Sequence, residues 1–220
     1  MRTVIFDLDG TLADTSGDLI AAANATFQAL DVAARLDPGT DAGTALRGGR
    51  AMLTLGLSRL GPVDDALVDK GYPILLEAYA AAIDHHTVLY PGAMDAVRAL
   101  SSAGYGVGIC TNKPEALAET LLTRLGVRDH FASLVGADTL AVRKPDPEPL
   151  RAAALRAGGD PARCLLVGDS ITDRKTAAAA GVPCVLVTFG PSGDDMAALN
   201  PEALLDDFAD LLPVTRGLIG

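Results

Sequence analysis

Residues 3–15 read TVIFDLDGTLADT, an apolar run that ends in two aspartates, Asp7 and Asp9. A buried strand that ends in two carboxylates places charge where desolvation is costly, so we expect a cation, most simply a divalent metal, to compensate it. The Gly10-Thr11 step predicts a sharp turn, which lets the backbone approach a ligand closely. Taken alone, the stretch is also compatible with a strand that runs into an aspartate-rich surface turn.

A second stretch, VGICTNKPEAL at residues 107–117, predicts another buried strand followed by a helix. Pro114 suits the first helical position, so Thr111, Asn112 and Lys113 fall in the loop between strand and helix. A hydroxyl, an amide and free backbone N–H groups beside the N-terminus of a helix suit a phosphate. Thr-Asn before a helix also occurs as ordinary capping.

A third stretch, AVRKPDPEPL at residues 141–150, places Lys144 in a loop rich in proline. Only four of the eighteen basic residues are lysines, and two of them, Lys113 and Lys144, lie in these loops. The loop is either a rigid solvated connector or the support for an ammonium group held near a phosphate or an acyl-phosphate.

A fourth stretch, CLLVGDSITDRKTAAAAG at residues 164–181, predicts a buried strand, then Asp169 and Asp173, and a helix closed by a glycine. If this strand lies beside the first, their ends are about 5 Å apart. Asp7, Asp9 and Asp169 then converge on one small volume. Hard oxygen ligands with room for water and phosphate oxygens suit magnesium better than zinc or copper.

The pattern along the chain predicts an α/β fold with a Rossmann-like open parallel sheet and helices on both faces, with active groups at the carboxyl ends of the strands. Strands are expected near residues 2–7, 106–111, 132–136, 164–168 and 184–188. Residues 15–86 are rich in Ala and Leu at helical spacing and predict an inserted all-helical cap, with a core formed by residues 1–14 and 87–220. We expect this cap to exclude water from the site.

Composition limits the partners of the chain. The net charge of −10 and the lack of a basic tract argue against nucleic acid or an anionic membrane as a partner. The sequence starts almost directly with the first strand, so we expect no signal peptide and a cytoplasmic protein, either a monomer or a homodimer. Three cysteines without CxxC spacing fit reduced core thiols rather than disulfides or a zinc site: Cys110, Cys164 and Cys184.

The motifs DLDGTLADT, TNKP, RKPDPEP and GDSITD occur in the order and approximate spacing of the haloacid dehalogenase-like phosphohydrolases, which the chain resembles over nearly its whole length. The resemblance is strongest to the phosphoglycolate-phosphatase-like branch, whose pattern recurs at Pro91-Gly92, Gly108, Thr111, Lys144 and Val167. It implies a magnesium-dependent phosphomonoester hydrolase.

The resemblance also implies a role for each matching residue. Asp7 would be the nucleophile that becomes an aspartyl-phosphate, and Asp9 the general acid and base. Thr111 and the backbone of Asn112 would hold the phosphoryl oxygens, and Lys144 would offset charge on the phosphoryl group and on Asp7.

The implied magnesium site uses oxygen atoms only. One carboxylate oxygen of Asp7, the backbone carbonyl of Asp9 and the side chain of Asp169 would hold the ion, and Asp173 would help directly or through water.

The leaving group is less well determined, and other chemistries have to be weighed. Arg47, Gly48 and Arg50 could present guanidinium groups to a substrate carboxylate, or both arginines could be solvated. We expect 2-phosphoglycolate as the substrate, with pyrophosphate, nucleoside monophosphates and sugar phosphates as alternatives.

Three other readings are less well supported. Asp9 argues against a dehalogenase, and the lack of a histidine in ADTSGDLIAAAN, residues 13–24, argues against a sugar-phosphate mutase. A non-catalytic phosphate-binding module would be expected to lack one of the four residues Asp7, Asp9, Lys144 and Asp169, all of which are present.

Overall fold

The computed structural model describes residues 1–191 and 195–220, which divide into two compact units. The sheet unit contains Met1–Ala13 and Leu89–Gly220, and the helical unit contains Asp14–Val88. The chain passes between them in the short strands β2 (Ala13–Asp14) and β3 (Val88–Leu89), which pair with each other. The helical insertion therefore interrupts the sheet unit directly after the first sequence motif.

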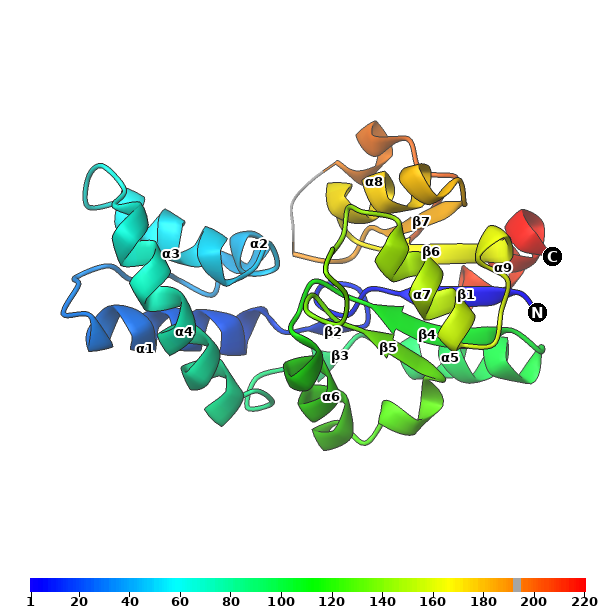
Figure 1. The fold of residues 1–220 in the computed structure, drawn as a ribbon, viewed down its shortest axis with the longest axis horizontal. Helices are drawn as coiled ribbons and strands as arrows, with labels where there is room; N and C mark the ends of the chain where they lie inside the picture. The colour runs from blue at the N-terminus through cyan, green and yellow to red at the C-terminus, as the bar shows by residue number, and fades with distance from the viewer. Residues whose placement is uncertain (192–194) are drawn as a thin grey trace. The chain divides into compact units, whose positions relative to one another are not determined.

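Six parallel strands form the sheet in the order β5-β4-β1-β6-β7-β8 (Figure 1). Their bounds are β1 Thr3–Phe6, β4 Gly106–Cys110, β5 Ser133–Val135, β6 Cys164–Gly168, β7 Cys184–Val187 and β8 Ala203–Leu205. The first five match the predicted strands. The inner strands are continuous apolar runs because helices cover both of their faces.

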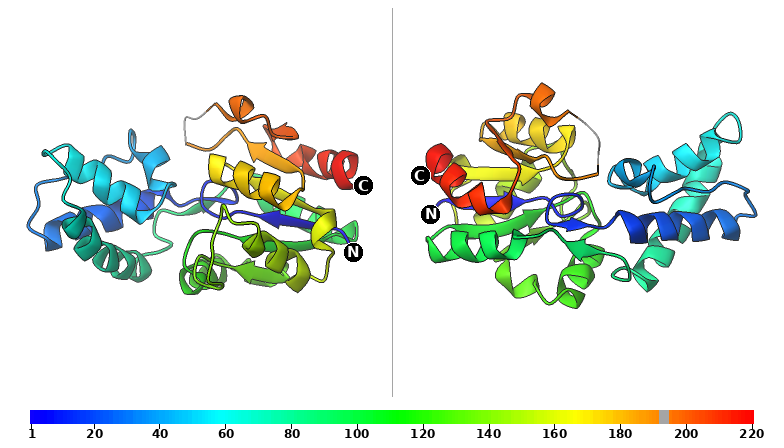
Figure 2. Two further views of the ribbon diagram at one scale, coloured as in Figure 1. Left: turned by 45° about the horizontal axis from the view of Figure 1, so that its top comes forward. Right: turned by 180° about the vertical axis from the view of Figure 1, so that it is seen from behind.

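The described part of the sheet unit contains five α-helices: α5 Ala93–Ser102, α6 Glu115–Arg124, α7 Glu148–Arg156, α8 Ile171–Ala180 and α9 Leu211–Ile219. Short 3-10 helices cover Arg128–His130, Pro161–Arg163, Met196–Leu199 and Phe208–Asp210. Helices α7 and α8 pack together on one face of the sheet, and α5 and α9 pack together on the other, as the front and back views show (Figures 1 and 2). The predicted α/β fold class is confirmed.

The core under α7 and α8 is made of strand residues that alternate toward that face. Ile5, Leu166 and Leu186 lie there with Leu150 and Ala153 of α7, and all five are fully buried. The three cysteines belong to the same core as free thiols, as predicted. β1, β6 and β7 therefore contribute to one hydrophobic core with α7.

The helical unit consists of α1 Ser16–Ala29, α2 Ala42–Ala45, α3 Gly49–Ser58 and α4 Asp65–Ala81. Helices α1 and α3 both pack on α4. The buried carboxylate of Asp18 in α1 accepts hydrogen bonds from the backbone N–H groups of His86 and Thr87, at 3.0 and 2.9 Å. It thereby ties the returning chain to α1. No helix in the described part of the chain is long and apolar enough to cross a membrane.

The register of the central strands decides where the motifs meet. Phe6, the last residue of β1, lies opposite Ile109 of β4 on one side and Val167 of β6 on the other. The residues that follow these three strands therefore leave the sheet at the same carboxyl edge. Three of the four sequence motifs follow these strands, and Lys144 of the fourth contacts Asp7 at this edge.

Candidate functional site

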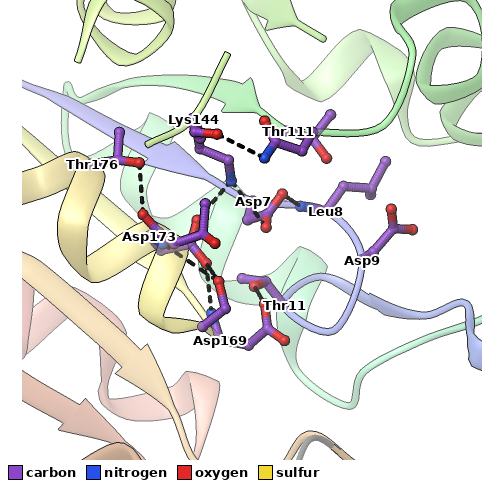
Figure 3. Close-up of polar contacts among 12 residues, drawn as sticks. Asp7, Leu8, Asp9, Thr11, Thr111, Lys144, Asp169, Asp173 and Thr176 are labelled. Carbon is purple, nitrogen blue, oxygen red and sulfur yellow. Dashed lines mark hydrogen bonds and ion pairs between the residues drawn. The ribbon is translucent and has the colours of Figure 1, made fainter. Parts of the chain in front are cut away.

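Three aspartates form an acidic cluster at the carboxyl edge of the sheet (Figure 3). Asp7 follows β1, Asp169 follows β6, and Asp173 lies in the first turn of α8. One carboxylate oxygen from each lies within 4.8 Å of the others. The Asp7 N–H donates to the Val167 carbonyl at 2.9 Å, which extends the β1–β6 pairing by one residue and fixes Asp7.

The start of α8 determines the position of Asp173. Ser170 caps the helix, and its hydroxyl donates to Asp173 Oδ2 at 2.5 Å. Gly168 leaves room for this packing, because a Cβ atom there would lie only 2.3 Å from Cγ of Asp173. The Thr11 hydroxyl donates to Asp169 Oδ1 at 3.0 Å. Each buried acid is thus oriented by a neighbouring group before any ligand arrives.

Lys144 supplies the positive charge inside this cluster. Its Nζ lies 2.6 Å from Asp173 Oδ1 and 3.0 Å from Asp7 Oδ2, and its side chain is almost fully buried. The side-chain amide of Asn112 donates to the Lys144 carbonyl at 3.0 Å. That bond joins the TNKP loop to the KPDP loop and holds the ammonium group in place.

Burial and the neighbouring charges shift the pKa values of the groups in the cluster. Burial raises the pKa of Asp7 to about 6, assisted by Asp173 and Asp9, although Lys144 opposes the shift. Burial, Asp173 and Asp7 also raise the pKa of Asp169 well above its usual value. Burial lowers the pKa of Lys144, but Asp173 and Asp7 outweigh that effect, so the net shift is upward.

The charge and the ligand chemistry of the cluster fit a divalent cation. Three carboxylates and one ammonium group leave a formal charge of −2 when all are ionised. The cluster offers carboxylate oxygens and neither histidine nor cysteine, which is the donor set that magnesium prefers.

The carboxylate of Asp9 lies apart from the cluster, which corrects the expectation that it converges with Asp7 and Asp169 (Figure 3). Both of its oxygens accept from Lys113 Nζ, at 2.7 and 2.9 Å. The reason is local: β1 ends at Phe6, and Gly10, with φ of +79°, turns the chain. Asp9 therefore does not continue the strand alternation that would have pointed it the same way as Asp7.

The predicted phosphate loop lies beside the cluster. The Thr111 N–H donates to the Val135 carbonyl at 2.9 Å, and the buried Thr111 hydroxyl accepts from the Lys113 N–H at 3.2 Å. The hydroxyl hydrogen can therefore point to an anionic ligand. Asn112 is exposed, and its side chain holds the Lys144 loop, as described above.

The residues predicted to contact the leaving group lie in the helical unit: Arg47, Gly48 and Arg50. Gly48, with φ of +98°, caps α3, and Arg47 is exposed just before it. The Arg50 guanidinium contacts Asp69 at 2.6 Å and lies 5.1 Å from the centroid of the Tyr72 ring. Arg50 thus already has partners inside its own unit.

Three site residues were absent from the predicted set. Ser170 was detectable, because SITD at residues 170–173 is a capping-box pattern. The sequence places Lys113 in the loop but does not indicate which acid it contacts. Thr11 carries no periodic or spacing signal that would connect it with Asp169.

Comparison with known proteins places this geometry among enzymes. A sequence model described as haloacid dehalogenase-like hydrolase matches residues 1–181. The chain is 42% identical over 214 residues to phosphoglycolate phosphatase of Rhodospirillum rubrum, covering 96% of this chain and 89% of that protein. It is 41% identical to phosphoglycolate phosphatase of Agrobacterium fabrum, covering 95% and 90%. A crystal structure from Haemophilus somnus, described as a predicted phosphoglycolate phosphatase, superposes with a TM-score of 0.85 at 26% identity and covers 98% of each chain.

Proposed function

Since the chain belongs to the haloacid dehalogenase-like hydrolase family, we propose that it is a phosphatase that cleaves a small phosphate monoester through an aspartyl-phosphate. One observation carries the proposal. The Asp7 carboxylate stands at the end of β1 within an acidic cluster, 3.0 Å from the ammonium group of Lys144. A partly exposed nucleophile beside a fixed positive charge is suited to attack on phosphorus.

In the first half-reaction, an Asp7 oxygen forms a bond to phosphorus and the bond from phosphorus to the ester oxygen breaks. Asp9 gives its proton to the departing alkoxide, so the alcohol leaves neutral. The Thr111 hydroxyl and the adjacent backbone hold the phosphoryl oxygens while Lys144 offsets their charge. These groups are in place beforehand, so little reorganisation accompanies the reaction.

In the second half-reaction, a water oxygen attacks phosphorus and gives a proton to Asp9. The bond from phosphorus to Asp7 breaks, which releases inorganic phosphate and restores the carboxylate. Asp9 thus returns to the protonated form in which it began. One carboxylate serves as acid and then as base without any other proton carrier.

We infer that Asp7, Asp169 and Asp173 hold a magnesium ion, together with the backbone carbonyl of Asp9. The ion would supply positive charge that offsets the formal charge of −2 on the cluster and the charge of the phosphoryl group. Asp169 is oriented for this role by Thr11, and Asp173 by Ser170. Lys144 keeps Asp7 directed toward the reacting phosphorus.

We propose 2-phosphoglycolate as the substrate. The support is that the chain is 42% and 41% identical to two phosphoglycolate phosphatases over nearly its whole length. We further propose that the helical unit acts as a cap over the site and that Arg47 or Arg50 meets the carboxylate of this substrate.

The test is phosphate release from a panel of esters by the purified protein with magnesium, run beside Asp7→Asn. We expect 2-phosphoglycolate to have the highest kcat/KM, and Asp7→Asn to be inactive toward every ester because an amide cannot form the acyl-phosphate. Circular dichroism of the variant serves as the folding control. A clean Asp7→Asn protein that still turns over would contradict the mechanism, and preference for another ester would contradict the substrate.

A further inference from the structure

A second buried lysine, Lys113, holds the acid to which the proposed mechanism assigns proton transfer. Its Nζ spans both oxygens of Asp9, at 2.7 and 2.9 Å. The Lys113 side chain is 3% exposed and that of Asp9 is 16% exposed, so the pair is largely removed from water. Ion pairs this dry are costly to form unless their geometry is good and other groups fix it.

The backbone on either side of Lys113 is fixed. The Lys113 N–H donates to the Thr111 hydroxyl at 3.2 Å, and its carbonyl accepts from the Ala137 N–H at 2.9 Å. Two residues on, the Glu115 N–H donates to Asp138 Oδ1 at 2.8 Å. The loop after β4 is therefore bonded to the loop after β5, and the Lys113 side chain starts from a defined point.

The two buried lysines divide the aspartates between them. Lys144 contacts Asp7 and Asp173, whereas Lys113 contacts Asp9. Lys144 already contacts the carboxylates of Asp7 and Asp173. Removing Lys113 would take away the contact that spans both oxygens of Asp9. The carboxylate that exchanges protons with the leaving alcohol would then be held less firmly.

We propose that Lys113 is a positioning residue that fixes the carboxylate of Asp9 in the orientation used for proton transfer. The inference rests on the proposed function, because that function makes Asp9 the acid and base. Lys113 acts through Asp9 and need not touch the substrate. A displacement of a reacting group by about 1 Å can lower the rate about 100-fold. An ion pair that fixes the orientation of Asp9 can therefore have a large effect on the rate.

The test is a double-mutant cycle with Lys113→Met, Asp9→Asn and the double variant, measured as kcat/KM for 2-phosphoglycolate and for nitrophenyl phosphate. The first leaves as an alkoxide that needs a proton, and the second as a phenolate that does not. We expect Lys113→Met to lower kcat/KM for 2-phosphoglycolate by about 100-fold, and far less for nitrophenyl phosphate. On the Asp9→Asn background it should add no further loss, and Lys113→Arg should restore part of the activity.

Two results would overturn the proposal. Equal losses for the two esters, or losses that add in the double variant, would mean that Lys113 acts on the bound phosphate or on the fold and not through Asp9. Lys70→Met, at an exposed lysine of α4, is the matched control and should behave as wild type. If Lys113→Met melts at a much lower temperature, the cycle is run with Lys113→Gln. Its amide can still donate to Asp9, so kcat/KM for 2-phosphoglycolate should fall less than in Lys113→Met.

Failure of the inference can be told apart from failure of the proposed function. Hydrolysis of nitrophenyl phosphate by the wild type, and its loss in Asp7→Asn, test the function without involving Lys113. If both hold and the cycle is additive, only the role of Lys113 is wrong.

Discussion

Asp7 and Asp9 stand two positions apart in the sequence, yet different lysines hold them. Asp7 contacts Lys144 in the acidic cluster, and Asp9 contacts Lys113 outside it. At the scale of single residues this separation supports the proposal that the two acids have different roles. The nucleophile needs a neighbouring cation and metal, whereas the proton carrier needs a fixed orientation near the leaving group.

Asp9→Asn tests that division. The amide cannot donate the proton of a carboxylic acid, so we expect a fall in kcat/KM of about 100-fold or more for an alkyl phosphate. The loss should be much smaller for nitrophenyl phosphate, because its phenolate leaves without a proton. The water attack that also uses Asp9 does not affect this comparison, since kcat/KM reports only the steps up to formation of the phosphoenzyme. The measurement is phosphate release from both esters over a range of concentrations. If both specificity constants fall by the same factor, Asp9 is not the acid of the first half-reaction.

At the scale of elements, the site depends on how closely α8 approaches the end of β6. Gly168 is the last residue of that strand, and a Cβ atom there would meet the Asp173 side chain at 2.3 to 2.6 Å. Because the Ser170 cap and Lys144 both hold Asp173, it cannot move aside without breaking one of these contacts.

Gly168→Ala should therefore weaken metal binding and activity together. We expect a destabilisation of about 1 to 3 kcal/mol and a higher magnesium concentration for half-maximal activity. Gly217→Ala is the matched control, since a Cβ atom there meets nothing within 4 Å, and the change should be neutral or slightly stabilising. Thermal denaturation and magnesium titration check both variants. An unchanged magnesium requirement in a folded Gly168→Ala protein would show that Asp173 does not contribute to the metal site.

The elements also show why part of the fold could be predicted and part could not. Strands β1 and β6 are uninterrupted buried runs bounded by turn signals, so their ends, and with them Asp7 and Asp169, were predictable. Strand β8 (Ala203–Leu205) is not predicted, because it is a three-residue edge strand within residues 201–208, PEALLDDF, which have the composition of a helix. The pairing of Asp9 with Lys113 depends on two loop conformations, and local sequence patterns do not determine which cation meets which acid.

At the scale of the whole molecule, the acidic cluster couples folding stability to pH and metal. The pKa of Asp7 is raised to about 6, so the folded state binds this proton more tightly than the unfolded chain does. Stability of the metal-free protein should therefore fall as pH rises from about 4 through about 6. A bound cation would reverse the effect by favouring the ionised carboxylates.

Magnesium should accordingly raise the melting temperature more at about pH 7.5 than at about pH 5. The measurement is differential scanning fluorimetry with and without magnesium after chelation, across that range. Asp7→Asn, which lacks the titrating group, should show a flatter pH dependence of the metal-free melting temperature. Equal stabilisation by magnesium at both pH values would argue against binding at this cluster.

The role proposed for the helical unit is the choice of substrate. Lys144 and the Thr111 loop would grip the phosphoryl group of any ester, whereas an arginine of the helical unit would contact only the remainder, such as the carboxylate of 2-phosphoglycolate. Arg47→Ala and Arg50→Ala are made separately. The variant that loses the charge-assisted contact should have a lower kcat/KM for 2-phosphoglycolate, equivalent to a loss of about 1.5 to 3 kcal/mol of transition-state stabilisation. Hydrolysis of nitrophenyl phosphate should change little in either variant.

Arg50 needs a further control because it already contacts Asp69. That pair is more than half exposed, and exposed pairs contribute about 0 to 1 kcal/mol, so breaking it should not unfold the unit. Asp69→Ala removes the partner and keeps the arginine. If Arg50 reads the substrate, Asp69→Ala should preserve kcat/KM for 2-phosphoglycolate while Arg50→Ala lowers it. If neither arginine changes the ratio of the two specificity constants, the helical unit does not select a carboxylate through them, and the choice of substrate must depend on other residues.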